Sequence, residues 1–206
     1  MKKILTAFLT IMAVFAFAAC GNTSTTNTEP PKDKTEKKVL VAYFSRADEN
    51  YEVGYIEKGN TKIVAEMLAQ MTGADLFEIK PVKPYPKEYE PATEIAKKEK
   101  EENARPQIVE PLPNIRDYDM IYLGYPIWWG DLPMAMYTFF DKSNFTGKTV
   151  APFATHAGSG LAGTEEYIAN ATKAKVLKGI EIRGSLAQNS PDTVKEELAK
   201  WVANME

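Results

Sequence analysis

From Lys38 onward, the apolar residues of the chain alternate between two spacings, and this alternation limits the folds available to it. The first run, 39–44, is continuous and rich in β-branched and aromatic residues, as expected for a strand buried on both faces. In the next run, 59–73, apolar residues recur at intervals of three and four, which predicts an amphipathic helix. Gly73 stands two residues after the last apolar residue, Met71, and is suited to end that helix.

The same pair of patterns repeats to the end of the chain. Because parallel strands need long crossovers, five strand–helix alternations predict an α/β fold, a doubly wound five-stranded parallel sheet between two helix layers. In such sheets, ligands bind beyond the carboxyl ends of the strands. The predicted strands are 39–44, 74–81, 117–126, 148–158 and 180–187, and the predicted helices are 59–73, 85–106, 132–143, 163–179 and 190–206.

The first strand-end loop carries groups suited to an anion. Ser45, Asn60 and Thr61 supply hydroxyl and amide groups, and Arg46 adds positive charge. The free N–H groups of the following helix favour a phosphate at the same place. A helix cap on a surface loop is the alternative interpretation. The segment lacks the G-K-[ST] ending of a Walker A loop, so a nucleoside triphosphatase is disfavoured.

The middle loop, "GYPIWWGDLP" (124–133), places Trp128 and Trp129 between glycines and prolines. Exposed aromatic faces at this point would stack on a flat ring system. The alternative is that a tryptophan plugs the end of the core, and we expect this of one of the pair.

The third loop contains "GSGLAG" (158–163), which matches the dinucleotide-binding pattern G-x-G-x-x-G. That pattern normally opens the first strand–helix unit, and here it belongs to the fourth. Glycines that let a flat ligand touch the backbone explain the loop as well. His156, the only histidine, is either structural or a ligand contact, and without a second His or Cys nearby we expect no metal site.

The first twenty residues read as an export signal, with Lys2 and Lys3 before an apolar stretch. Cys20 stands where a bacterial lipobox places the lipidated cysteine, so we expect lipid anchoring at the outer face of the cytoplasmic membrane. Cleavage after Ala18 is the alternative. Polar residues 21–37 predict a flexible tether, leaving 38–206 as the folded domain.

Charge argues against nucleic acid as a partner. The formal net charge is −3, and losing Lys2 and Lys3 leaves 23 basic against 28 acidic residues, a net charge of −5. No basic stripe is present.

The segments "VLVAYFSR…GNTKIVAEML", "DYDMIYLGYPIWWGDLP" and "VAPFATHAGSG" together resemble the flavodoxin family. The resemblance implies strand order 2-1-3-4-5 and FMN as a non-covalent cofactor. It implies a phosphate site at Ser45, Asn60 and Thr61, to which the neighbouring Arg46 would add positive charge. It implies ring contacts from Pro126, Ile127, Trp128, Trp129 and Gly130, and from His156, Ala157, Gly158, Ser159 and Gly160.

Three functions remain open at this stage. The first is an electron carrier that serves a redox protein or a small-molecule acceptor. The second is an FMN-dependent NAD(P)H oxidoreductase acting on a quinone-like molecule, and the third is a lipoprotein that binds flavin without turnover. The chain departs from the usual pattern by an insertion at 47–58, for which we expect a role over the site or toward a partner.

Overall fold

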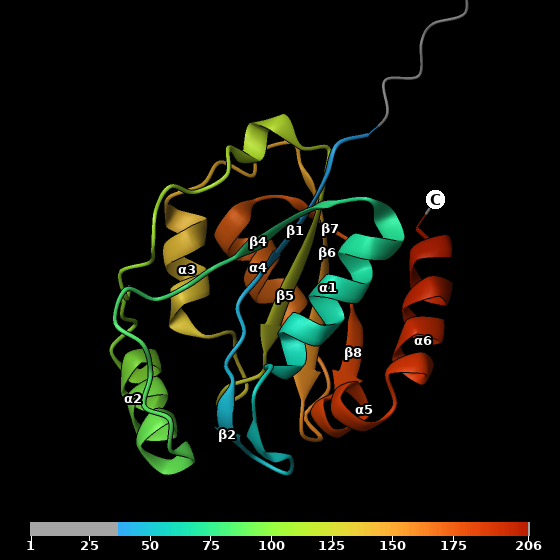
Figure 1. Ribbon diagram of the computed structural model, residues 1–206. Helices are drawn as coiled ribbons and strands as arrows, with labels where there is room; N and C mark the ends of the chain where they lie inside the picture. Colours follow the sequence, from blue (N-terminus) through green and yellow to red (C-terminus); the bar gives the residue numbers. More distant parts are fainter. Residues whose placement is uncertain (1–36, 206) are drawn as a thin grey trace, which may run out of the picture. The chain divides into compact units, whose positions relative to one another are not determined.

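The computed structural model describes residues 37–205, which lie in one compact unit, Glu36–Glu206. Its centre is a parallel sheet in the order β4-β1-β5-β6-β7, with β8 also paired to β6 (Figure 1). This is the predicted order 2-1-3-4-5. The strands of the sheet are β1 (Val39–Tyr43), β4 (Asp75–Glu78), β5 (Met120–Pro126), β6 (Thr149–His156), β7 (Lys175–Val176) and β8 (Ile180–Arg183).

The fifth strand position is shared by two short strands. The strand β5 pairs with one edge of β6, so β7 and β8 must both lie along the other edge, β7 at Thr149 and Val150 and β8 at Phe153–His156. The predicted strand 180–187 is therefore wrong after Arg183. Residues from Gly184 onward form helix α5 (Gly184–Asn189). The predicted helix 163–179 is also too long, because α4 (Thr164–Thr172) ends at Lys173 in the left-handed conformation.

Two hydrophobic cores separate the sheet from its two helix layers. Alternate residues of β1 point to opposite faces, so Val41 and Tyr43 join one core while Leu40 and Ala42 join the other. The first core packs under α1 (Asn60–Thr72), α5 and α6 (Pro191–Ala203). The second packs under α3 (Met134–Asp141) and α4.

Helix α2 (Tyr89–Glu101) does not cover a sheet face. It contacts α3 and the strand β2, at the lower left in Figure 1, and its buried residues are Ala92 and Ala96. It is shorter than the predicted 85–106 at both ends. The helix thus forms a side wall beyond the carboxyl ends of the strands.

The insertion at 47–58 is a small antiparallel hairpin, β2 (Asp48–Asn50) and β3 (Gly54–Ile56). A short 3₁₀ helix (Ile115–Asp117) precedes β5. The predicted signal segment 1–20, with Cys20, and all of the predicted tether except Lys37 lie outside the described residues. Among the helices within 37–205, none is long and apolar enough to cross a membrane.

A candidate cofactor cavity at the strand ends

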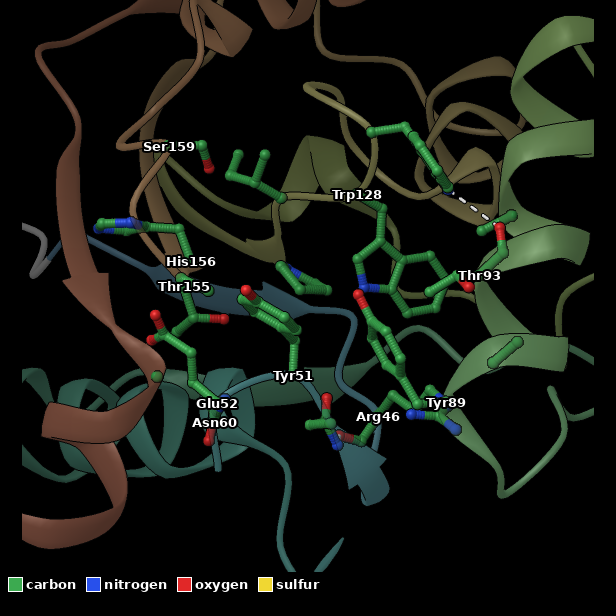
Figure 2. Close-up of a pocket in the computed structure, with 18 of the residues that line it drawn as sticks. Arg46, Tyr51, Glu52, Asn60, Tyr89, Thr93, Trp128, Thr155, His156 and Ser159 are labelled. Carbon is green, nitrogen blue, oxygen red and sulfur yellow. Dashed lines mark hydrogen bonds between the residues drawn. The ribbon is translucent and has the colours of Figure 1, made fainter. Parts of the chain in front are cut away.

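A cavity of about 320 Å³ opens at the carboxyl ends of β1, β5 and β6, where the fold is expected to hold its ligand. Figure 2 shows its side chains converging from these strand ends, from α2 and from the inserted hairpin. Its walls combine aromatic rings with hydroxyl, amide and charged groups. The lining residues are Arg46, Asn50, Tyr51, Glu52, Asn60, Tyr89, Ala92, Thr93, Ala96, Pro126–Trp129, Thr155–Ala157, Ser159, Gly184 and Ser185.

The polar end of the cavity is built around the start of α1. Gly59 precedes the helix, and a Cβ at this position would lie 2.3 Å from Ser45 Oγ and 2.5 Å from the backbone oxygen of Arg46. Only glycine allows this close approach. The backbone N–H of Lys62 donates to Ser45 Oγ at 3.0 Å, so Ser45 caps a helix that begins fifteen residues later in the chain.

Asn60, the first residue of α1, is oriented by α5. Gln188 Nε2 donates to Asn60 Oδ1 at 2.7 Å, which leaves the Nδ2 group of Asn60 as the donor at the cavity wall. A Cβ at Gly184 would lie 2.3 Å from that Nδ2 atom. At Gly184 the chain leaves β8 and begins α5. A side chain at this position would displace Asn60.

Thr61 and Arg46 are engaged within the protein. Thr61 is buried, and its Oγ1 lies 2.7 Å from Oγ1 of Thr155, so the hydroxyl joins α1 to β6 rather than reaching the cavity. The Arg46 guanidinium donates to the carbonyls of Glu49 at 2.5 Å, Pro86 at 2.7 Å and Lys87 at 2.8 Å. Burial lowers the pKa of Arg46 below its usual range. Arg46 lines the cavity, but these bonds use it as a clamp between two loops.

Trp128 joins the core and the cavity. Its ring meets Phe44 edge to face at 5.3 Å between centroids and Tyr85 at 5.0 Å. It also lines the cavity. Such perpendicular contacts fix the ring plane, so Trp128 offers a rigid wall.

Trp129 is held differently, because it is 53% exposed and reaches outward to α2. Its indole N–H donates to the carbonyl of Thr93 at 2.9 Å, and its own carbonyl accepts from Lys100 Nζ at 2.6 Å. Lys97 Nζ lies 5.5 Å from the ring centroid. Trp129 and Gly130 both have positive φ (53° and 73°), and Trp128 and Asp131 exchange backbone hydrogen bonds around them, forming a tight reverse turn.

His156 organises the third loop. Its Nδ1 accepts from the N–H groups of Gly158 at 2.8 Å and Gly160 at 3.2 Å. The neutral imidazole therefore carries its proton on Nε2, which lies 3.2 Å from Glu181 Oε2. Burial of the ring lowers the pKa of His156, and the neighbouring Glu181 only partly opposes this.

The glycines of "GSGLAG" serve this loop. Gly158, Gly160 and Gly163 all have positive φ, and a Cβ at Gly160 would lie 2.6 Å from Glu181 Oε2. A tight turn around His156 accounts for the pattern that resembled a dinucleotide fingerprint.

The structure brings most of the predicted site residues to the cavity and leaves some behind it. Ser45 and Thr61 lie behind the polar end, and Gly130, Gly158 and Gly160 shape loops without lining it. On the cavity wall are Arg46, Asn60, Pro126, Ile127, Trp128, Trp129, His156, Ala157 and Ser159.

Several lining residues were not expected from the sequence. Thr155 lies near the carboxyl end of the predicted strand 148–158, and that position was a usable signal. The others come from α2, the start of α5 and the inserted hairpin, which join the site only through the tertiary fold. They are Asn50, Tyr51, Glu52, Tyr89, Ala92, Thr93, Ala96, Gly184 and Ser185.

The fold and the cavity define a flavodoxin-like α/β protein, and comparison with known proteins agrees. The flavodoxin family model matches residues 38–205, so this chain belongs to the flavodoxin family. No curated protein matches the sequence.

The solved structures that match this chain include proteins described as flavoproteins. Those from Bacteroides eggerthii and Bacteroides uniformis are each 28% identical with TM-scores of 0.61, covering 80% and 79% of this chain and 97% and 98% of theirs. A flavoprotein from Lactobacillus acidophilus in complex with FMN shares the fold at 22% identity and a TM-score of 0.58, over 81% of this chain and 99% of its own.

The cavity suits FMN chemically. A helix N-terminus without acidic residues in its first turn, an amide donor and Ser185 suit a phosphate, and the tryptophan side suits a planar ring. Within residues 37–205, no group of three His, Cys, Asp or Glu side chains is placed to hold a metal ion.

Proposed function

We propose that this protein binds FMN in the strand-end cavity and transfers electrons through it. The main support for this proposal is that the start of α1 and a fixed aromatic wall line the same cavity in a member of the flavodoxin family. FMN supplies reversible redox chemistry, while the protein supplies binding, orientation and electrostatics.

At the polar end, the protein holds an anion with fixed dipoles. The first turn of α1 carries no acidic residue, and its N–H groups and positive dipole end favour a phosphate. Asn60, held by Gln188, adds an amide donor, and Ser185 lies at the same wall. Ser45 and Thr61 support this end from behind through their bonds to Lys62 and Thr155.

At the aromatic end, the protein presents an apolar and aromatic wall. Trp128 is fixed by Phe44 and Tyr85, and Ile127 and Pro126 continue the apolar surface. The single histidine is committed to the loop through Nδ1. Because FMN carries the redox chemistry, binding and orientation by the protein are enough for electron transfer to a redox partner or small acceptor.

The direct test is a titration of the purified protein with FMN, followed by flavin and tryptophan fluorescence. We expect saturable quenching at micromolar or tighter affinity. If correctly folded protein leaves flavin fluorescence unchanged, the proposal fails.

A second measurement separates the carrier from an oxidoreductase. Loaded protein is mixed with NADH or NADPH in the presence of a quinone, without any other protein. We expect slow oxidation of the nicotinamide, since a carrier depends on its partner. Rapid turnover would show that the protein is an oxidoreductase rather than an electron carrier.

We further propose export and lipid anchoring through Cys20 at the outer face of the cytoplasmic membrane. Support comes from the sequence, in which Lys2 and Lys3 precede an apolar stretch that ends at "FAAC". Expression in a bacterial host and fractionation should place the protein with membranes, and Cys20→Ser should release it or retain its precursor. An unchanged distribution of the Cys20→Ser protein would contradict lipidation.

A further inference from the structure

We propose that the inserted hairpin β2–β3 covers the mouth of the flavin cavity, and that Tyr51 at its turn contacts the bound flavin ring and slows its release. This inference rests on the proposed function. It assigns a role to the insertion within the first strand-end loop, and it names a ligand-contacting residue, Tyr51, that the sequence analysis did not single out.

One side of the hairpin is anchored to the start of α2. The backbone N–H of Glu49 donates to the Lys87 carbonyl at 3.1 Å, and the Glu49 carboxylate accepts from the backbone N–H of Tyr89 at 2.8 Å. The Arg46 clamp joins the same two segments. With this many polar contacts, the hairpin is held in place beside the cavity rather than left as a free loop.

The hairpin is also fixed internally. The carboxamide of Asn50 donates to the carbonyls of Ala47 at 3.2 Å and Asp48 at 3.1 Å, and Ile56 is buried. These contacts define the direction in which the turn residues point.

The turn of the hairpin extends across the mouth. Tyr51 lies against Tyr89 of α2, with ring centroids 5.9 Å apart and an interplanar angle of 31°. The next residue, Glu52, has φ of 64° and its carboxylate lies 4.0 Å from Arg183 Nη1 at the end of β8. The turn therefore meets α2 on one side and β8 on the other.

Figure 2 shows Tyr51 pointing into the cavity, between Thr155 and Trp128. Its side chain lines the cavity, yet 63% of the residue remains exposed. A ring ligand in the cavity would cover part of that exposed aromatic surface. Burying aromatic surface against a planar ring is favourable, so Tyr51 gains contact only when the cavity is filled.

The hairpin contains its own control. Tyr55 lies in β3 and is 68% exposed, about as much as Tyr51, but it does not line the cavity. Removing either ring leaves no hole in the core. The two positions differ in whether the side chain faces the cavity and in the ring contact that Tyr51 makes with Tyr89.

The experiment compares Tyr51→Ala, Tyr51→Phe and Tyr55→Ala with the unaltered protein. FMN affinity is measured by fluorescence titration, and release by stopped-flow transfer to an excess of a second flavin-binding protein. We expect Tyr51→Ala to weaken FMN binding about tenfold, mostly through faster dissociation, as for loss of one stacked aromatic. Tyr51→Phe should retain the affinity, because the ring is kept, and Tyr55→Ala should match the unaltered protein.

The outcomes separate this inference from the proposed function. If the unaltered protein binds FMN and Tyr51→Ala binds it equally well with the same release rate, the hairpin does not cover the ligand and only this inference fails. Equal losses in Tyr51→Ala and Tyr55→Ala would also overturn it, since a general loosening of the hairpin would then explain both. Absence of FMN binding by the folded, unaltered protein overturns the proposed function and this inference together.

Discussion

Backbone contacts build the polar end of the cavity, whereas side-chain rings build its aromatic end. At the polar end, Gly59 and Gly184 leave no space for a Cβ against Ser45 and Asn60. At the aromatic end, Trp128 is packed by rings and Trp129 is tied to the surface of α2. Backbone moves less readily than side chains, so the polar end should tolerate substitution least.

The largest expected effect is that of Gly59→Val. Its Cβ would lie 2.5 Å from the Arg46 backbone oxygen, which cannot rotate away. We expect FMN affinity to fall about a hundredfold and the free energy of unfolding to fall by about 1–3 kcal/mol. Urea denaturation and FMN titration measure the two quantities.

The matched control is Gly73→Ala at the other end of α1. Gly73 has φ of 67°, and a Cβ at this position would meet no atom within 4 Å, so only the left-handed conformation costs free energy, about 1 kcal/mol. FMN binding should not change. Normal FMN affinity in Gly59→Val would show that the polar end adapts, contrary to the comparison.

The ligand can be changed instead of the protein. Riboflavin lacks the phosphate, so it loses the contacts of the polar end and keeps those of the aromatic end. We expect roughly 30-fold weaker binding than for FMN, corresponding to about 2 kcal/mol from hydrogen bonds to a charged group. Competition titrations with both flavins measure the ratio of the two affinities. Equal affinities would show that the polar end does not bind the phosphate.

The two tryptophans sharpen the comparison within the aromatic end. Trp128→Leu removes a ring packed against Phe44 and Tyr85, and we expect the free energy of unfolding to fall by about 2 kcal/mol. Trp129→Leu loses exposed contacts, so the expected fall is about 0.5 kcal/mol. Parallel denaturation curves test this order, and a reversed order would show that α2 depends on Trp129 more than the core depends on Trp128.

The smallest expected effect concerns pH and the third loop. Because the pKa of His156 is lowered from 6.5 in the folded protein, folding favours the neutral ring. The stabilisation is complete above pH 6.5 and is lost as pH falls from 6.5 toward the lowered folded pKa. Protonation at Nδ1 would break the bonds from Gly158 and Gly160.

The measurement is the free energy of unfolding between pH 5 and 8 for the unaltered protein and for His156→Asn, whose amide oxygen can accept the same bonds. We expect the unaltered protein to lose more stability on acidification. Identical pH profiles would mean that His156 does not titrate with folding.

The sequence predicted the strand order through the family resemblance and the element types through periodicity, but it placed some boundaries wrongly. Strand 180–187 stops at Arg183, and the next residue, Gly184, begins α5 against the Asn60 side chain, a contact that no local pattern reports. The middle loop was foreseen as a wall of the site, with one tryptophan of the pair packed into the core, but which of the two would pack was not foreseen. Which ring packs and which is exposed depends on Phe44, Tyr85 and α2, all distant in sequence.

Local chemistry therefore accounts for the elements of this protein and for the loops that can meet at the strand ends. Buried strands and amphipathic helices are recorded in short-range periodicity, because each depends on neighbouring residues along one face. The tertiary structure alone decided that Ser45 caps α1, that Gln188 orients Asn60 and that Tyr51 faces the cavity. These are contacts between segments far apart in the chain, and their partners are chosen by the packing of the whole domain.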